Sequence, residues 1–220
     1  MLVIQDKSFA NTWASLVQEI MHNGQEYYTE YNELAKYTTT YIKYNRSSVE
    51  EMERLELHPQ FPTRTQHLLS YLFQFNEKEG SKYNNFTYTY FLRLKGQLDE
   101  IVKRGLKVNS RRNIGITWRI EEDLNSTSPP CLIYFSIFRY NLDKCKLYLH
   151  WRSRDIYTAY QSNLCALVYM INNSVLQKVN KKLKIYEIYE SIDNAHIHKY
   201  DWDEALKIKT IASNPQYYYK

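Results

Sequence analysis

The sequence predicts a single α+β domain, with a mixed β-sheet flanked by helices. Apolar residues recur at helical spacing early in the chain and again near its middle. Alternating and fully apolar runs, typical of strands, follow between residues 113 and 153. Helical and strand patterns then return, and no repeat or linker interrupts the chain of 220 residues, so we assign 1–220 to one domain.

The first half is predicted to be mainly helical. Residues 8–23 form a helix because their apolar side chains share one face, and Gly24 follows as a stop. Residues 37–64 are polar and contain two prolines, which predicts a loop that could hold a short helix. Residues 64–75 are apolar almost all round, which predicts a buried helix, and 97–106 have the pattern of an amphipathic helix.

The second half is predicted to supply the sheet. Residues 113–120 and 144–153 alternate in polarity, whereas 131–139 are apolar on both faces, as a covered strand would be. "RYNLDK" is the predicted turn between the last two of these strands. A long helix over 156–178, a strand over 184–192 and a closing helix in "WDEALKI" complete the domain.

Composition excludes several classes of function. The net charge of +5 is spread over dispersed basic residues, which favours an anionic ligand only slightly. Five glycines, without GxGxxG or GxxxxGK[ST], exclude a glycine-rich phosphate loop. Three cysteines without a CxxC pair argue against a disulfide framework or a zinc site and favour a reducing cytoplasm. No signal peptide or membrane-spanning run is found, so we expect no membrane partner. We expect no metal and no DNA partner either.

Polar clusters lie at the ends of the predicted elements rather than in their middles. They are "SRR" at 110–112, "PPC" at 129–131, "WRSRD" at 151–155 and "AHIH" at 195–198, with Asn163 as a fifth point. Each has a structural explanation when taken alone. The arginines could be a solvated face, the cysteine core packing, the aspartate a helix N-cap, and the amide and histidines ordinary polar side chains.

Taken in order, these strings resemble the thymidylate synthase family, which contains pyrimidine-nucleotide methylases and hydroxymethylases. The resemblance covers residues 86–206 and is strongest to the short, archaeal-type branch, which has similar "WRS-x-D-I-Y" and "S-x-AHIY" strings. Residues 1–80 show little likeness beyond an early helix. The resemblance implies the fold of that family and an obligate symmetric homodimer that pairs through its sheet and shares its active sites.

The resemblance also implies a role for each cluster around a bound nucleotide. Cys131 matches the nucleophile, whose thiolate adds to C6 of the pyrimidine. Arg152 and Ser153 match the phosphate ligands of the same subunit, and Arg111 and Arg112 match the pair donated by the partner subunit.

The remaining matches concern the base, the sugar and a proton. Asn163 matches the residue that contacts O4 and N3–H of uracil, which favours dUMP over dCMP. Asp155 matches an aspartate that orients the base. His196, with His198, matches the pair that holds the 3′-hydroxyl, and Tyr90 matches a tyrosine near the proton that leaves C5.

The sequence departs from the family pattern at several positions. His198 stands where tyrosine is usual, Phe91 where glycine is usual, and Leu132 where many members have histidine. The glutamate that organises water and the mobile N-terminal arginine have no clear counterpart. The nearest candidates are Glu77 and Glu79 for the glutamate, and Arg46 and Arg64 for the arginine.

Three functions remain open. The first is a thymidylate synthase that makes dTMP from dUMP with methylene-tetrahydrofolate or methylene-tetrahydromethanopterin. The second is a pyrimidine-nucleotide hydroxymethylase, which shares Cys131 and the phosphate site but in which water, and not a hydride, adds to the exocyclic methylene. The third is a nucleotide- or RNA-binding protein on the same fold with weakened catalysis.

Overall fold

One mixed sheet organises the protein. The computed structural model describes residues 1–5, 7–62, 65–75 and 88–211. Its eight-stranded sheet has the order β1-β3-β8-β6-β5-β4, with β2 beside β3 and β7 beside β8. The strands are β1 (Leu2–Gln5), β2 (Gln25–Tyr28), β3 (Leu34–Tyr44), β4 (Ile114–Ile116), β5 (Leu132–Arg139), β6 (Lys144–Trp151), β7 (Arg154–Asp155) and β8 (Lys184–His198).

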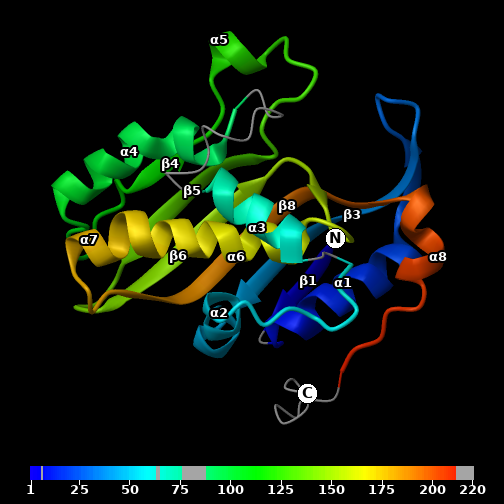
Figure 1. Cartoon of the computed structure of the whole chain (residues 1–220), viewed down its shortest axis with the longest axis horizontal. Helices are drawn as coiled ribbons and strands as arrows, with labels where there is room; N and C mark the ends of the chain where they lie inside the picture. Colours follow the sequence, from blue (N-terminus) through cyan, green and yellow to red (C-terminus); the bar gives the residue numbers. More distant parts are fainter. Residues whose placement is uncertain (6, 63–64, 76–87, 212–220) are drawn as a thin grey trace.

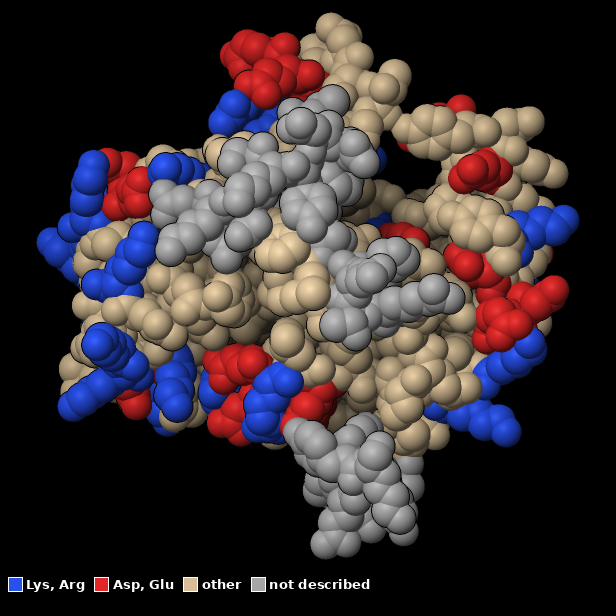
Figure 2. All heavy atoms as spheres, in the orientation of Figure 1, with Lys and Arg blue, Asp and Glu red and all other residues tan. Residues whose placement is uncertain are grey.

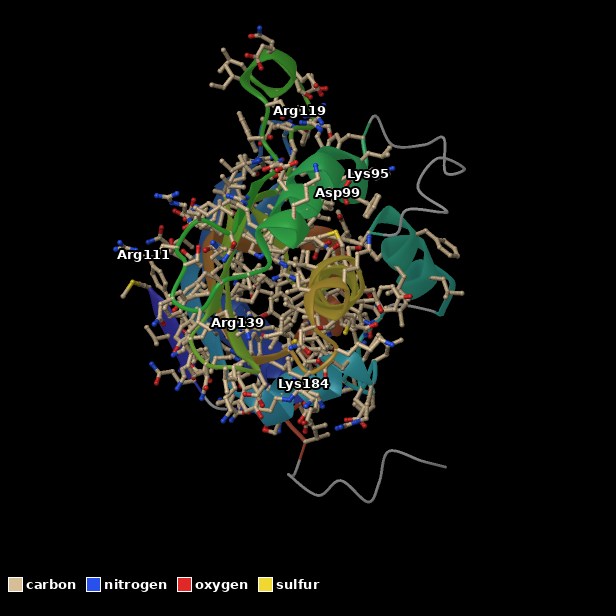
Figure 3. The ribbon with its side chains drawn as sticks, turned by 90° about the vertical axis from the view of Figure 1, so that its left-hand side faces the viewer. Lys95, Asp99, Arg111, Arg119, Arg139 and Lys184 are labelled. Carbon is tan, nitrogen blue, oxygen red and sulfur yellow. The ribbon has the colours of Figure 1, made fainter. Side chains whose placement is uncertain are left out.

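Most of the described helices, among them α1, α3, α4 and α6, cover one face of this sheet, which gives a two-layer structure, whereas α5 lies in a projecting loop (Figures 1 and 3). They are α1 (Phe9–Asn23), α2 (Arg46–Glu53), α3 (Thr65–Gln74), α4 (Tyr90–Arg104), α5 (Ile120–Asp123), α6 (Tyr160–Ile171), the π-helix η1 (Asn172–Leu176), α7 (Gln177–Val179), the 3-10 helix η2 (Lys199–Asp201) and α8 (Trp202–Ala205). The predicted α+β class with a helix-flanked mixed sheet is confirmed. None of the described helices is long and apolar enough to cross a membrane.

Local signals in the sequence explain where the two longest helices begin and end. The Ser8 hydroxyl caps α1 by accepting the Asn11 N–H at 3.2 Å. The Thr89 hydroxyl caps α4 in the same way, through the Leu92 N–H at 3.2 Å. Helix α4 ends at Gly105, whose φ of 72° is readily adopted only by glycine.

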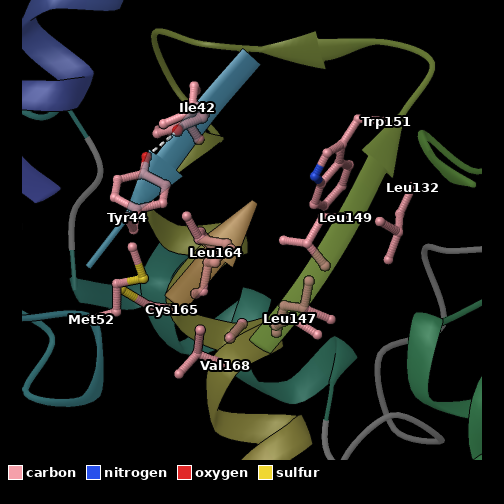
Figure 4. Close-up of a cluster of buried hydrophobic side chains, with 14 of the residues drawn as sticks. Ile42, Tyr44, Met52, Leu132, Leu147, Leu149, Trp151, Leu164, Cys165 and Val168 are labelled. Atoms are coloured by element: carbon pink, nitrogen blue, oxygen red, sulfur yellow. Dashed lines mark hydrogen bonds between the residues drawn. The ribbon is translucent and has the colours of Figure 1, made fainter. Parts of the chain in front are cut away.

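The core lies between the helices and the inner face of the sheet. β6 alternates, so that Cys145, Leu147, Leu149 and Trp151 are buried as predicted. Figure 4 shows Leu147, Leu149 and Trp151 packing with residues from β3 and α6, among them Cys165 beside Met52. Cys145 and Cys165 are therefore core residues, which leaves Cys131 as the half-buried cysteine.

The prediction for residues 37–64 is partly wrong. They contain most of β3, an eleven-residue strand, followed by α2. Polar side chains misled the prediction, because Lys43 and the exposed Tyr41 lie on the outer face of the sheet. The inner positions Ile42 and Tyr44 are buried and show the period of two expected of a strand.

The predicted strands also need correction at their ends. The strand predicted over 113–120 is only β4, because α5 starts at Ile120. In β4 the exposed residues are the isoleucines, whereas Gly115 is buried under the Phe135 ring. The strand predicted over 184–192 continues to His198, which extends β8 into the histidine cluster.

Candidate active site

Cys131 lies at the point where β5 begins and β6 ends. Leu132 pairs with Trp151 across these antiparallel strands, and the Arg152 N–H donates to the Cys131 carbonyl at 2.9 Å. The "PPC" and "WRSRD" clusters, about twenty residues apart in sequence, are thereby brought side by side. The Cys131 side chain is half-buried and packs against the edge of the core.

The two prolines before Cys131 serve as hydrogen-bond acceptors. Arg152 Nε donates to the Pro130 carbonyl at 3.0 Å, and Nη2 donates to the Pro129 carbonyl at 2.8 Å. The Trp118 indole donates to the Pro130 carbonyl as well, at 3.0 Å. Since proline has no N–H, neither proline can donate a ladder bond, and the Arg152 guanidinium holds the segment through its carbonyls instead. The double proline thus lets one arginine set the position of the cysteine.

The charges around Cys131 oppose one another. Burial raises the pKa of its thiol, and the guanidinium groups of Arg152 and Arg154 act to lower that pKa. Asp155 and Glu30 raise it further. The net pKa lies above the ordinary value, so at neutral pH the free protein carries a thiol, with two cations near it that favour the thiolate.

Three tyrosines lie close enough to this thiol to affect its electrostatics and be affected by it. The Tyr90 hydroxyl is buried and accepts the Leu132 N–H at 3.4 Å, and burial raises its pKa. Burial also raises the pKa of Tyr71 and of Tyr88 to about 12, with the charge of Cys131 contributing to both shifts. All three hydroxyls therefore stay protonated at neutral pH.

Ser153, Asp155 and the histidines gather where β7 pairs with β8. Asp155 lies opposite His196 in the parallel ladder, and the Ser153 hydroxyl lies 3.4 Å from His196 Nδ1. Burial lowers the pKa of His196, which keeps its imidazole neutral at pH 7. The His198 ring lies edge-on to the His196 ring, with centroids 4.9 Å apart.

Asp155 also fixes the turn that leads into α6. Its carboxylate accepts the Thr158 N–H at 3.0 Å and the Thr158 hydroxyl. The aspartate therefore caps a turn and not a helix, so its structural explanation as a helix N-cap is wrong: the N-cap of α6 is Ala159. Its charge still acts on Cys131 and His196.

Asn163 is one turn into α6 and has an unmet hydrogen-bonding group. Its Oδ1 atom is buried and finds no partner among the described residues. A buried acceptor without a donor costs about 1–3 kcal/mol. Such an atom suits a ligand that brings an N–H to it.

A hairpin that sequence reasoning missed borders the same region. β2 and β3 form it, and its turn places Glu33 Oε2 3.4 Å from His198 Nδ1. The Tyr31 hydroxyl in this turn donates to the Thr127 carbonyl, in the loop after α5. Figure 2 shows a hollow between the hairpin tip and that loop. The tyrosines of "EYYTEYNELAKY", which favour strands, were the available signal.

Comparison with known proteins identifies the family. The thymidylate synthase family model matches residues 71–216. A protein of Methanothermobacter thermautotrophicus named "Putative thymidylate synthase" is 29% identical over 93% of this chain and 97% of its own length. One of the same name from Methanocaldococcus jannaschii is 27% identical over 94% and 99%. The chain belongs to the thymidylate synthase family. Members of this family bind dUMP and use a folate-type cofactor.

The expected phosphate arginines of a thymidylate synthase are not all brought together within one chain. Arg111 and Arg112 are exposed just before β4, at the level of Ile137 in β5, whereas Cys131 precedes the first residue of β5. Six residues of strand separate these levels by about 20 Å. Arg111 points away from the body of the domain in Figure 3.

The candidates for the N-terminal arginine and the water-organising glutamate are not found beside Cys131. Arg46 is not near Cys131, because its guanidinium bonds Glu50, Glu53 and the Ile185 carbonyl beside α2. Arg64, Glu77 and Glu79 lie outside the described residues. Within the described part of the chain, no three His, Cys, Asp or Glu side chains are grouped as metal ligands.

Proposed function

We propose that this protein is a thymidylate synthase that methylates dUMP to dTMP through a covalent bond between Cys131 and C6 of the base. The observation that carries the proposal is the anchoring of Arg152 to the two prolyl carbonyls, which holds a cysteine and a guanidinium side by side at one end of the sheet. Family membership supplies the substrate class.

The thiolate of Cys131 would attack C6 of the pyrimidine. A C–S bond forms at C6, the electrons of the C5–C6 double bond move into an enolate over C5, C4 and O4, and C5 becomes nucleophilic. Arg152 and Arg154 favour the thiolate, whereas burial opposes it. We therefore expect a thiol in the resting protein that ionises as the reaction begins.

Binding of the nucleotide phosphate falls to Arg152 and Ser153 from the same chain. Arg152 Nη1 has no partner among the described residues, so the guanidinium retains donors while its Nε and Nη2 hold the prolines. The Ser153 hydroxyl lies beside it in sequence and contacts His196. His196 and His198 are the groups for the 3′-hydroxyl.

Asn163 would distinguish uracil from cytosine. Its unpartnered Oδ1 can accept the N3–H of uracil, while its Nδ2 donates to O4. Cytosine has no proton on N3, so it would leave the same oxygen unsatisfied. Binding the correct base therefore recovers the cost of the buried acceptor.

Two aromatic residues suit a flat pterin beside the base. Tyr71 and Tyr88 are half-buried, and both hydroxyls are electrostatically coupled to Cys131. Their rings offer faces on which a pterin can stack. When bound, the methylene-pterin supplies the one-carbon unit and the hydride. Both tetrahydrofolate and tetrahydromethanopterin forms fit this description. Tyr90, fixed by the Leu132 N–H, would act near the C5 proton through water.

The proposal includes a symmetric homodimer formed through the open face of the sheet. Exposed side chains on this face include Val3, Tyr41, Tyr134 and Tyr148, which surround a depression of about 310 Å³. Contiguous exposed apolar surface of this kind marks interaction sites. A two-fold partner docked here can bring its Arg111 and Arg112 to the phosphate, which their own chain holds far from Cys131.

Release of tritium from [5-³H]-dUMP tests the function. Release with formation of dTMP supports the synthase, and release with a hydroxymethyl product supports the hydroxymethylase instead. Tight dUMP binding without release under either pterin would leave only the binding-protein hypothesis. Cys131→Ala should bind dUMP but release no tritium.

Complementation tests the shared site. Arg112→Ala subunits mixed with Cys131→Ala subunits should recover part of the activity, since one site of the mixed dimer keeps both residues. Verified mixed dimers without recovery would contradict the role of the partner's arginines.

A further inference from the structure

Arg154 is a buried cation that lies in sequence between Ser153 and Asp155, two residues expected to act on the substrate. It belongs to β7, and its side chain is only 1% exposed. The guanidinium carbon lies 4.1 Å from the centroid of the Trp151 ring and 4.2 Å from that of the Tyr160 ring. Two aromatic rings therefore enclose the charge.

A buried carboxylate and two tyrosines complete this network. Arg154 Nη1 donates to Glu190, whose side chain is 0% exposed, and Nη2 donates to the Tyr160 carbonyl at 2.8 Å. The Tyr160 hydroxyl donates to the other Glu190 oxygen at 2.8 Å and bonds the Tyr44 hydroxyl. Figure 4 shows Tyr44 and Trp151 in this part of the core.

Stability alone does not account for such a network. Buried ion pairs lose the hydration of both charges, and well-packed apolar replacements are often neutral or stabilising. The pair does fix the positions of three elements relative to one another. Arg154 ties β7 to Glu190 in β8 and to the carbonyl of Tyr160, the first residue of α6. Asn163 lies three residues after Tyr160, within the first turn of the same helix.

We propose that Arg154 is a positioning residue for the reaction, which with Glu190 sets the first turn of α6 relative to Cys131 and supplies a second cation that favours the thiolate. This inference rests on the proposed function, because it assigns Asn163 to the base and Cys131 to the covalent step. It deepens that function by naming a pair that touches neither substrate nor cofactor.

The groups that face Cys131 define what the charge can do. Arg152 and Arg154 favour the thiolate, whereas Asp155, Glu30 and burial favour the thiol. Removing Arg154 leaves Arg152 as the cation that opposes these three effects. The pH at which Cys131 becomes reactive should then rise.

The main test uses the double variant Arg154→Met/Glu190→Gln, which removes both buried charges and keeps similar volumes, so it should fold. We expect kcat/KM for dUMP to fall about 10- to 100-fold, since a displacement of about 1 Å can cost that much. We expect the midpoint of Cys131 alkylation by iodoacetamide, measured on its peptide across pH, to rise by about half a unit or more.

Arg154→Lys separates the two effects. Lysine keeps the charge but lacks the forked donors that bridge Glu190 and the Tyr160 carbonyl. The alkylation midpoint should return toward that of the wild type, while kcat/KM stays low. Arg46→Met/Glu53→Gln is the matched control, because it removes an Arg–Glu pair that also bonds a β8 carbonyl, at Ile185. This control should change neither quantity.

A folded double variant with wild-type kcat, KM and alkylation midpoint would overturn the inference. Failure of the proposed function gives a different result. A wild-type protein that releases no tritium refutes the synthase and hydroxymethylase activities, whereas its Cys131 alkylation midpoint, compared with that of the variants, still tests the effect of Arg154 on the thiol.

Discussion

Arg152→Lys tests whether the guanidinium that holds the double proline is required to place the nucleophile. Arg152 donates to the Pro129 and Pro130 carbonyls at 2.8 and 3.0 Å, which needs two nitrogens of one planar group. Lysine has a single nitrogen on a flexible stem and can retain one of these bonds at most. The positive charge beside Cys131 is kept.

The magnitude follows from the lost bond. A hydrogen bond from a charged donor contributes about 1.5–3 kcal/mol. If that energy serves to position the thiol, kcat/KM should fall by about one to two powers of ten, at about 1.4 kcal/mol for each. Because the charge remains, the pH midpoint of Cys131 alkylation should change little. Arg152→Met should lower kcat/KM further and raise the midpoint.

Tritium release from [5-³H]-dUMP measures kcat/KM, and the rate of alkylation across pH gives the pH midpoint at which the Cys131 thiol becomes reactive. Arg139→Lys is the control, since Arg139 donates to the carbonyls of Leu106, Asn141 and Leu142 at the opposite end of β5. It should leave kcat/KM within about twofold of the wild type, as a surface change away from the site would. An Arg152→Lys protein with wild-type kcat/KM would show that anchoring of the prolines is not needed.

Three further predictions concern stability and assembly. Gly115→Ala should destabilise by about 1–3 kcal/mol in urea, because a Cβ there would lie 2.3 Å from the Phe135 ring. Gly96→Ala in α4 meets no atom within 4 Å and should stabilise by about 0.5–1 kcal/mol, so equal effects would refute the packing argument. Arg93 lowers the pKa of Asp123, so this carboxylate stabilises the fold above its usual pKa near 4 and loses that effect as pH falls through its folded pKa. Asp123→Asn should therefore cost about 3 kcal/mol at pH 7, and the deficit should shrink below about pH 4; a pH-independent deficit would contradict the ion pair. Tyr148→Glu on the open face should give monomers in sedimentation velocity, and a retained dimer would exclude this face as the interface.

Sequence patterns predicted the elements whose two faces differ in polarity. Helix α1 and strand β6 were found within one or two residues, because Trp13 and Leu147 belong to uninterrupted apolar faces. Strand β3 was missed because tyrosine, threonine and lysine occupy its open face, and a polar open face has the composition of a loop. β4 had the expected alternation, but a glycine rather than the isoleucines faces the core, since only its lack of a Cβ admits the Phe135 ring.

The candidate site was predictable where neighbouring elements along the chain bring its residues together. Cys131 and Arg152 could be placed together because a hairpin of two strands joins them. The contact between Glu33 and His198 could not, because it depends on the hairpin of β2 and β3 lying beside the end of β8. The pairing of Arg154 with Glu190 could not be predicted either. The two residues are 36 positions apart, and nothing in the sequence around either one indicates that it is buried or which residue it pairs with.

The strand order has a consequence for how the chain is made. Among the described residues β8 is the last strand in sequence, yet it lies in the middle of the sheet, between β3 and β6. Until residue 198 has left the ribosome, the portions built from β1–β3 and from β4–β6 each expose a long unpaired edge on the side that β8 will fill. Such late closure depends on contacts distant in sequence and slows folding. Nascent chains that stall before β8 should therefore be the species most in need of a chaperone.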